Sequence, residues 1–491
     1  MMTSNVRKHR DILRKIARKA MILRGLLPDY SPAALSELER IQPAPFGAEG
    51  SVRDLRHFPW CSIDNDDSRD LDQLTVSESI STGKTKIYVA IADVDAIVKR
   101  DTAIDDHARH NTTSIYTVAE VFPMLPEKLS TDLTSLNYAV DRLAIVVEMV
   151  IGTDGSLQDS HIYRAIVHNH AKLAYNRVAE WLESQGDVPE DVRSVQGLED
   201  NLLIQDKVAQ TMKTFRHIHG ALTLETIESR PVFEDDNLME LEKEKKNRAR
   251  DIIEDFMIAA NGMTARYLNA KMFPSLRRVV HIPKRWDRIV EIASEVQFRL
   301  PAAPDSKMLE QFLVERKRVD PVGFPDLSLS IIKLLGPGEY VAEFAGQTDE
   351  GHFGLAVKDY THSTAPNRRY PDLITQRLLK AALAGGPVPY DNNELTALAA
   401  HCTAEEDAVK KVERQVEKSA AAMLLESRIG EQFDGIITGA ASKGTWVRLF
   451  HPPIEGKLIR GFEGADVGHR IRVQLVHTDI ERGFIDFKRV R

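Results

Sequence analysis

Five aspartates lie within nine consecutive positions, from residue 64 to residue 72, and this segment carries the strongest chemical signal in the chain. They are Asp64, Asp66, Asp67, Asp70 and Asp72. Like charges this close repel one another unless cations, basic side chains or water hold them. Carboxylate oxygens are the ligands that Mg²⁺ and Mn²⁺ prefer. The segment therefore indicates either a catalytic divalent-metal site or a solvated acidic loop.

A calcium-binding EF-hand loop is excluded by the spacing of these residues. Counted from Asp64, the sixth position is Arg69, where the sharp turn needs glycine. The twelfth position is Thr75, where the loop needs a bidentate glutamate. An apolar run that includes Leu74 and Val76 follows the acids at once, so we expect them to border buried structure.

The composition is that of a globular protein. A chain of 491 residues is long enough for roughly two to four domains. Its two cysteines, Cys61 and Cys402, exclude a disulfide framework and fit a reducing compartment. No apolar stretch reaches the roughly 18 residues that a membrane span needs. We therefore expect a cytoplasmic protein without a membrane partner, and the net charge of −8 argues against nonspecific coating of duplexes.

We expect residues 1–50 to form a basic helical region. Residues 1–24 carry eight Arg or Lys against one acid, with apolar residues at helical spacing. Ser31 and Pro32 provide the N-cap and the first turn of a second helix that ends near Ile41. The region could be a helix-turn-helix-like element that binds RNA, a packing arm with solvated cations, or an organellar targeting peptide.

Residues 51–428 are expected to form one mixed α+β domain. Segments 86–92 and 143–150 have the apolar runs of buried strands, and segments 171–184 and 249–268 are expected to be helices. The clearest helix spans 403–428, because valines form one stripe and a dense charged face lies opposite.

Residues 429–491 differ in character and predict a five-stranded OB-fold barrel, because short alternating runs are separated by glycines. Aromatic and His rings are interleaved with Arg and Lys. This pattern suits single-stranded nucleic acid, in which bases stack on rings and cations hold phosphates. We expect core packing for at least half of the rings. They are Phe433, Trp446, Phe450, His451 and Phe462.

Several motifs together resemble the ribonuclease II/R family, whose catalytic part is called the RNB domain. Asp64, Asp70 and Asp72 fit the family pattern Asp-x5-Asp-x-Asp-Asp. His352-Phe353-Gly354-Leu355, followed by segment 360–373, is the most specific match. The remaining matches are to the tyrosine-bearing loop at 112–116, the Pro-Met-Leu-Pro segment at 122–130, a second tyrosine-bearing segment at 171–175 and a signature at 254–261. The terminal barrel resembles the family's OB-fold domain of the ribosomal S-one type.

The resemblance implies a processive 3′→5′ exoribonuclease that hydrolyses single-stranded RNA to nucleoside 5′-monophosphates with Mg²⁺, for which Mn²⁺ can substitute. Two such ions about 4 Å apart can activate a water and neutralise charge on the phosphate and the leaving oxygen. We assign Asp64, Asp70 and Asp72 as ligands, with Asp72 closest to catalysis. Arg368 is expected to contact the scissile phosphate through its planar guanidinium, and the alternative is a salt bridge to Asp372.

The resemblance also implies RNA contacts by six further residues. Tyr116 and Tyr175 are expected to stack on bases at the 3′ end. Phe233 is expected to clamp the terminal nucleotide, with core packing as the alternative. Glu413 matches a family position near the RNA end, or belongs to an ordinary charged helix face. The full set is Tyr116, Tyr175, Phe233, Glu254, Arg369 and Glu413.

Two departures from the family pattern modify these expectations. The family usually places two cold-shock domains before the catalytic domain, where this sequence has about fifty residues. We therefore expect a short form whose RNA entry is guarded by the basic helical region and the barrel, and which tolerates structured RNA better. Gln73 occupies the place of the fourth aspartate. Its side-chain carbonyl can coordinate Mg²⁺ but brings no negative charge. The affinity for the metal should therefore fall unless Asp66 or Asp67 supplies the missing charge. A catalytically weak or inactive RNA-binding protein is the alternative function.

Overall fold

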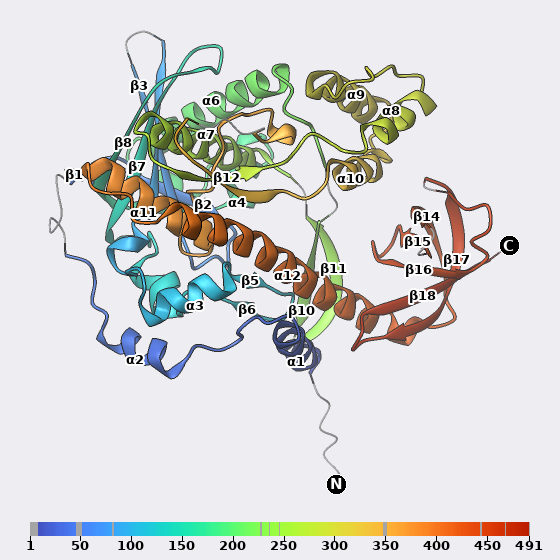
Figure 1. Ribbon diagram of the computed structural model, residues 1–491. Coiled ribbons are helices and arrows are strands. Elements are labelled where there is room, and N and C mark those ends of the chain that lie inside the picture. The colour runs from blue at the N-terminus through green and yellow to red at the C-terminus, as the bar shows by residue number, and fades with distance from the viewer. Residues whose placement is uncertain are drawn as a thin grey trace.

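The computed structural model contains a helical N-terminal pair, an α+β body and a barrel, and a long helix runs from the body to the barrel (Figure 1). This confirms the predicted α+β class. The residues that it describes are 8–45, 52–80, 83–225, 228–234, 236–244, 246–346, 351–441, 444–466 and 468–490.

A seven-stranded mixed sheet forms the centre of the body. Its two edge pairs, β1 with β8 and β2 with β9, are parallel, and the other pairs are antiparallel. The predicted strands at 86–92 and 143–150 are confirmed within β4 and β7. In spatial order the strands are β1 (Arg53–Asp54), β8 (Leu157–His168), β7 (Asp141–Ile151), β4 (Thr85–Ala92), β3 (Gln73–Ser79), β2 (Cys61–Asp64) and β9 (Ala171–Ala174).

The helix predicted at 171–184 is wrong in its first four residues, which form β9. Ala171 and Leu173 are buried whereas Lys172 between them is exposed, which is the period of a strand. The backbone pairs with β2, and Asp64 lies opposite Ala174. The helix itself begins at Tyr175. Pairing with a distant strand overrides local propensity here.

Helices surround the sheet. The helix predicted at 249–268 is confirmed by α7, and the one predicted at 403–428 is confirmed by α12, which begins earlier in the chain. The helices of the body are α3 (Ala103–Asn111), α4 (Tyr175–Leu182), α5 (Glu190–Arg193), α6 (Leu198–Ile218), α7 (Arg248–Ala270), α8 (Trp286–Glu295), α9 (Ser306–Val319), α10 (Phe324–Leu335), α11 (Tyr370–Ala384) and α12 (Asn392–Leu425). Short helical turns occur at Val94–Ala96, Lys128–Leu133, Phe353–Leu355 and Glu426–Arg428.

Three antiparallel two-stranded sheets lie outside the main sheet. The first carries Tyr116 and the second carries Phe233. They are β5 (Ile115–Tyr116) with β6 (Val121–Phe122), β10 (Glu228–Glu234) with β11 (Asn237–Glu244), and β12 (Ser275–Val279) with β13 (Glu339–Glu343).

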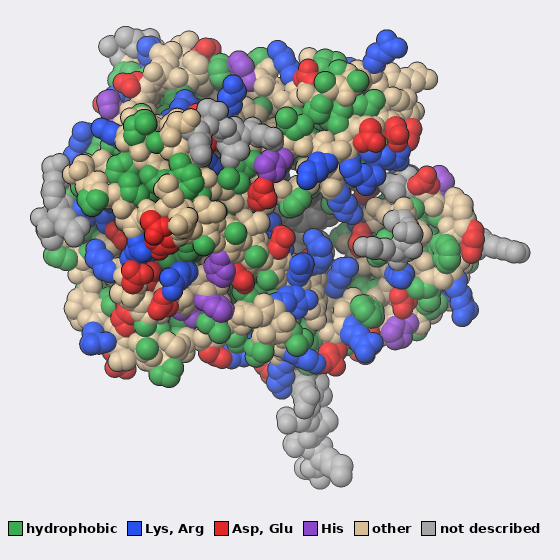
Figure 2. Space-filling view, in the orientation of Figure 1, with side chains coloured by type: hydrophobic (Ala, Val, Ile, Leu, Met, Phe, Trp, Pro, Cys, Tyr) green, Lys and Arg blue, Asp and Glu red, His purple; other side chains and the backbone are tan. Residues whose placement is uncertain are grey.

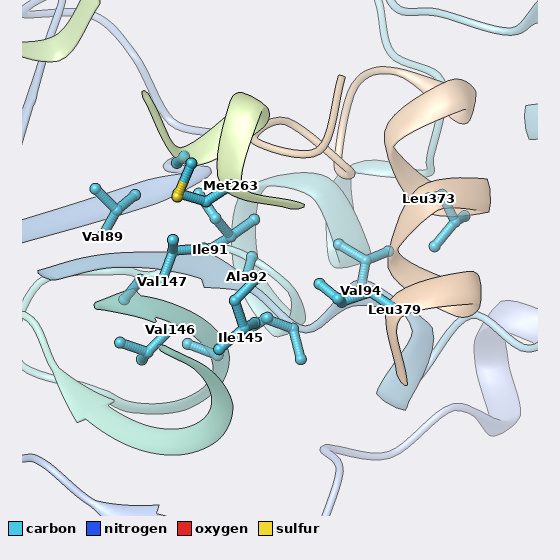
Figure 3. Packing of buried hydrophobic residues seen from close by; sticks show 14 of the residues in the cluster. Val89, Ile91, Ala92, Val94, Ile145, Val146, Val147, Met263, Leu373 and Leu379 are labelled. Carbon is cyan, nitrogen blue, oxygen red and sulfur yellow. The ribbon is translucent and has the colours of Figure 1, made fainter. Parts of the chain in front are cut away.

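The main core joins the central strands to α7 and α11. Val89 of β4 and Val147 of β7 lie beneath Met263 of α7, and Leu373 of α11 faces Val94 (Figure 3). All five side chains are buried. Leu71 and Leu74 are buried in the same cluster, so this packing holds the end of the acidic segment and the start of β3.

The N-terminal helices α1 (His9–Ile22) and α2 (Pro32–Arg40) form as predicted. Leu13 and Ile16 of α1 are buried in one apolar cluster with Val412 and Val416 of α12. The helix α1 is therefore a packed part of the body, as the packing-arm alternative describes.

The closed five-stranded barrel confirms the predicted OB-type architecture. Phe433 is buried in it, whereas Phe462 is exposed. The last turn of α12 joins the barrel core through Leu425, and Gly483 approaches α12 so closely that a Cβ there would lie 2.8 Å from Lys418 Cβ. Its strands are β14 (Gln432–Ala441), β15 (Gly444–Leu449), β16 (Glu455–Arg460), β17 (Arg470–Asp479) and β18 (Phe484–Arg489). In the described part of the chain, no helix is both long and apolar enough to cross a membrane.

Replacing Leu13 by Ala should lower the free energy of unfolding by about 2–5 kcal/mol, because it leaves a cavity between α1 and α12. Leu23, which is 72% exposed just after α1, is the matched control. Its replacement by Ala should change stability by less than about 0.5 kcal/mol. Urea unfolding followed by circular dichroism measures both, and equal effects of the two substitutions would contradict the packing described.

Candidate active site

The acidic segment connects the end of β2 to the start of β3, and it is fixed to the body near β3. Asp64 is the last residue of β2, and β3 begins at Gln73. Between them, the amide of Leu71 donates to Ser135 Oγ at 2.9 Å. The carbonyl of Asp72 accepts from the amide of Ala92 at 3.0 Å. The end of the segment is therefore held by the body.

The acids differ in burial. Asp66 and Asp67 are exposed, Asp64 and Asp70 are half-buried, and the side chain of Asp72 is 3% exposed. The solvated-loop alternative thus describes the tip of the segment and fails for Asp72.

Asp72 is paired with Arg368 from the other end of the domain. Arg368 Nε donates to Asp72 Oδ2 at 2.8 Å, and the amide of Asn367 donates to Asp72 Oδ1 at 3.3 Å. Burial raises the pKa of Asp72 to about 7, against the opposing charge of Arg368. The Arg368 side chain is 41% exposed. Its guanidinium therefore neutralises a buried carboxylate while it still faces solvent.

A side-chain brace holds these two segments together. Thr134 Oγ1 donates to Asn367 Oδ1 at 2.8 Å, and Asn367 Nδ2 donates to the carbonyl of Thr134 at 3.2 Å. The adjacent Ser135 donates through Oγ to the carbonyl of Arg69 at 3.2 Å. Asn367 is fully buried. The brace fixes the separation of the acidic segment from Arg368.

Tyr116 connects Asp70 to α12. Its hydroxyl donates to Asp70 Oδ2 at 3.0 Å, and its amide donates to Glu413 Oε1 at 3.0 Å. The pKa of the Glu413 carboxyl is raised by burial, and the Tyr116 amide opposes that rise. Glu413 thus holds the tyrosine loop and is not part of an ordinary solvated helix face. The Tyr116 side chain remains 42% exposed beside the acids.

Tyr175 reaches the same edge because β2 and β9 are parallel. Asp64 and Ala174 are paired, so Tyr175 leaves the sheet where the acidic segment does. The Arg250 guanidinium lies 5.0 Å from the centre of the Tyr175 ring. Arg250 Nη2 also donates to Asn65 Oδ1 at 3.1 Å. An arginine of α7 therefore joins the second tyrosine to the acidic segment.

The alternative prediction for Arg368, a salt bridge to Asp372, is wrong. Asp372 accepts instead from Arg369 Nη2 at 2.8 Å and from the amide of Ala365 at 2.9 Å. A residue four positions along a helix is the usual partner, but Arg368 lies before α11 and points to Asp72. Arg369 is therefore used to neutralise buried Asp372.

Phe233 and Glu254 contact other parts of the protein than the pair of Asp72 and Arg368. Phe233 packs against the cluster that includes Ile115 and Phe122, as the core-packing alternative describes. Glu254 is half-exposed, with Lys246 Nζ at 3.9 Å, and lines a cavity of about 920 Å³ with residues of α6 and α9. Their RNA contacts stay predictions.

The carboxylates of Asp64, Asp70 and Asp72 suit a hard divalent cation. Two of them are paired with other side chains in this structure. Among the described residues, no group of three or more His, Cys, Asp or Glu is arranged to hold a metal ion. Asp72 faces Arg368, and Asp70 faces Tyr116. Burial raises the pKa of Asp64 and of Asp72, and the charge of Asp70 raises both further. A cation would relieve this repulsion. Asp64, Asp70 and Asp72 therefore stay the predicted ligands.

Gln73 is buried at the start of β3, where its backbone pairs with Ile91. Within the described residues its side chain forms no hydrogen bond. It adds an amide and no charge next to Asp72, so the charge of the site is that of three carboxylates and Arg368.

Sequence reasoning missed the residues that connect the site. The only sequence feature that points to Asn367 is its position beside Arg368 in the motif at 360–373. Thr134, Ser135 and Arg250 gave none, because their contacts are made across the fold.

Taken together, the structure is an α+β domain with carboxylates at the ends of its sheet strands and an arginine placed against them, joined by a long helix to an OB-type barrel. Residues 52–385 match the RNB domain, and residues 431–490 match the RNase II-type exonuclease C-terminal S1 domain. The chain belongs to the RNB family, which confirms the resemblance found in its motifs.

Similar proteins include Ribonuclease R of Vibrio cholerae, which is 32% identical over 427 residues that cover 82% of this chain and 50% of that protein. Ribonuclease R of Escherichia coli K12 is 30% identical over 434 residues, which cover 84% and 52%. The chain thus spans about half the length of these curated relatives.

Two solved structures show the same fold. Mycoplasma genitalium RNase R, in complex with ribose-methylated single-stranded RNA, has a TM-score of 0.87 at 24% identity, with 98% of this chain and 78% of that chain covered. Yeast Ssd1, a pseudonuclease, has a TM-score of 0.71 at 15% identity, with 91% and 55% covered.

Replacing Arg368 by Gln should lower the free energy of unfolding by about 1–3 kcal/mol at pH 8 without divalent ions, because Asp72 then stays buried without its cation. Adding Asp72→Asn should recover most of this loss. Arg69→Gln is the control, because Arg69 pairs with Glu127 at 3.8 Å on the surface, and such pairs contribute less than about 1 kcal/mol. Urea unfolding measures all three variants against the parent chain. A loss that Asp72→Asn leaves unchanged would contradict the pairing.

Proposed function

We propose that this chain is a processive, metal-dependent 3′→5′ exoribonuclease that hydrolyses RNA to nucleoside 5′-monophosphates. The observation that carries the proposal is the pairing of Asp72 with Arg368, beside Asp64 and Asp70, in a chain of the RNB family. Carboxylates and a half-exposed guanidinium in one place are what hydrolysis of a phosphodiester requires.

Asp64, Asp70 and Asp72 would hold Mg²⁺ or Mn²⁺. When bound, the ion would supply an activated water and neutralise charge on the phosphate. Arg368 uses Nε to hold Asp72, so its two Nη groups are available to bind non-bridging phosphate oxygens. Asn367 and Thr134 keep this arginine in register with the acids.

Two tyrosines would hold the 3′-terminal nucleotides. Tyr116 donates to Asp70, and Tyr175 follows Ala174, which pairs with Asp64. Each ring can stack on a base of any identity, which gives binding without sequence preference. Phe233, Glu254, Arg369 and Glu413 complete the proposed RNA-binding set.

RNA is the substrate that the molecular surface supports. Figure 2 shows a hollow between the body and the barrel, with Lys and Arg side chains on its rim. Cations around a groove favour a phosphate backbone. Solved structures of Mycoplasma genitalium RNase R contain single-stranded RNA and double-stranded RNA. We propose single-stranded RNA as the main substrate and structured RNA as a further one.

Incubation of the full chain with 5′-labelled oligo(A) and Mg²⁺ or Mn²⁺ should give a ladder that converges on a short product. Chelation of the metal should abolish the ladder. Asp72→Asn should lower the rate by more than about 100-fold, because it removes both a ligand and the partner of Arg368. RNA affinity, measured by gel shift, should stay largely intact. Full activity of Asp72→Asn would overturn the assigned role.

A second candidate function is binding of RNA with little or no hydrolysis, and Gln73 is the observation that favours it. Gln73 stands where the family pattern has a fourth aspartate, and one charge fewer weakens a magnesium site. The fold alone does not decide between the two functions. Retention of full-length RNA together with a gel shift would indicate the binding function.

Gln73→Asp separates these functions further. Adding a carboxylate should lower the Mg²⁺ concentration for half-maximal activity by about tenfold, because it restores one charge to the ligand set. Gln73→Glu is the matched control, since it keeps the length of glutamine and adds the same charge at a different reach. Titration of Mg²⁺ in the oligo(A) assay measures both. An unchanged requirement in Gln73→Asp would show that position 73 does not act on the metal.

A further inference from the structure

The barrel is joined to the body on two sides of the hollow shown in Figure 2: by the end of α12, and by an ion pair between Arg448 of β15 and Asp326 of α10. We propose that this ion pair closes a protein ring around the RNA, so that a strand enters by a free end and leaves slowly. The inference rests on the proposed function, because it concerns how the same RNA reaches the acids.

The helices α8, α9 and α10 form a three-helix lobe, residues 286–335, with an apolar cluster of its own. Phe324 and Ile331 of α10 are buried in this cluster, and Phe353 of the body packs against it. Asp326 lies in the first turn of α10. The positive end of a helix dipole favours a carboxylate at this position. The lobe therefore presents Asp326 from a fixed place.

The barrel has a separate apolar cluster, which it shares with the last turns of α12. Leu425 of α12 and Phe487 of β18 are buried in it. In the described part of the chain, no buried residue belongs both to this cluster and to that of the three-helix lobe. Apolar packing therefore fixes the barrel to α12 and leaves its contact with the lobe to polar groups.

The ion pair is covered on both sides. Arg448 Nη2 lies 2.6 Å from Asp326 Oδ1, and the two side chains are 14% and 13% exposed. Glu455 lies directly opposite Arg448 on β16, a position at which opposite charges usually pair. Glu455 instead accepts from Thr438 Oγ1 at 2.8 Å. Arg448 is thus directed away from its own sheet and towards the lobe.

A second pair of charges faces the same gap. The pKa of Arg288 on α8 is raised, first by its hydrogen bond to Glu291 and in smaller part by the charge of Asp466. Asp466 belongs to the barrel, where it lies between β16 and β17. The barrel and the three-helix lobe therefore attract each other through charge at two places. In Figure 1, α10 lies on one side of this arrangement and α12 on the other.

The enclosed hollow leads to the acidic segment along α12. Burial raises the pKa of Glu417 on α12, and the charge of Glu455 in the barrel raises it further. One turn earlier, Glu413 accepts from the amide of Tyr116, whose hydroxyl donates to Asp70. The same helix therefore borders both the barrel and the acids. A strand that follows α12 to the acids passes through the protein ring.

The test compares a linear RNA with a covalently closed circle of the same sequence, each bound to the full chain with Asp72→Asn so that RNA is not consumed. A circle has no end to thread, so a closed ring should exclude it and an opened ring should admit it from the side. Arg448→Gln and Asp326→Asn should each raise the dissociation rate of the linear RNA about fivefold, as expected for loss of one ion pair. Each should also narrow the difference in affinity between line and circle. Stopped-flow fluorescence with labelled RNA and excess unlabelled competitor measures dissociation.

The two substitutions change the net charge in opposite directions. By charge alone, Arg448→Gln should weaken the binding of RNA and Asp326→Asn should strengthen it. The closed ring predicts faster dissociation for both. The double variant should equal either single variant, because both remove the same contact. Arg472→Gln is the matched control, since it removes a barrel cation whose ion pair is with Asp434 of the same barrel.

A cross-link tests the closed state directly. Asp326→Cys and Arg448→Cys in one chain, joined by a short bismaleimide before RNA is added, should still bind the linear RNA and exclude the circle. The native Cys61 and Cys402 are buried and should not react. Circular dichroism checks that each variant is folded. Failure of the cross-linked chain to bind linear RNA would overturn the inference, because the strand would then have to enter from the side.

The outcomes separate the inference from the proposed function. Dissociation in Arg448→Gln and Asp326→Asn equal to that in Arg472→Gln would overturn the inference alone. Opposite effects of the two substitutions would also overturn it, because net charge would then be the cause. Failure of the parent chain to bind linear RNA would overturn the proposed function, and the inference with it.

Discussion

The ion pair between Asp72 and Arg368 is the interaction on which the rest of the site depends. A carboxylate buried this fully is costly unless a cation compensates it. The raised pKa of Asp72 shows that the compensation is incomplete, because burial outweighs the charge of Arg368. The protein thus keeps a buried acid that would gain from a second cation, which is a useful property for a metal ligand and a poor one for stability.

The backbone of Arg368 is fixed as well as its side chain. Its carbonyl accepts from the amide of Ser114 at 2.9 Å and from Thr113 Oγ1 at 3.0 Å. The tyrosine loop that follows is consequently anchored to the same arginine whose side chain holds the acid. Tyr116 then reaches Asp70. Acid, arginine and tyrosine are therefore coupled through short contacts, and a displacement of one segment moves all three.

The sequence predicted the kinds of element better than the contacts between them. Local patterns were sufficient for α7, the interior of α12 and the barrel, since periodicity and glycine spacing are properties of the chain itself. They were insufficient at residues 171–174, where only the parallel pairing with β2 makes a strand. The aspartate spacing identified the acids, but no pattern could identify Asp72 as the buried one or Arg368 as its partner. Those facts depend on burial and on the Thr134–Asn367 brace, which the fold creates.

The basic helix α1 shows why charge patterns alone leave function open. Its cations suggested an RNA-binding face, yet several of them are engaged within the protein: Lys8 and Arg10 with Asp236, Arg18 with Asp29 and Lys19 with Glu481. Glu481 lies between β17 and β18 of the barrel, and Asp236 lies between β10 and β11. The helix thus connects the barrel to the hairpin of Phe233 while its apolar face rests on α12. These cations have acidic partners within the protein, so the charge pattern of α1 by itself does not assign the helix to RNA binding.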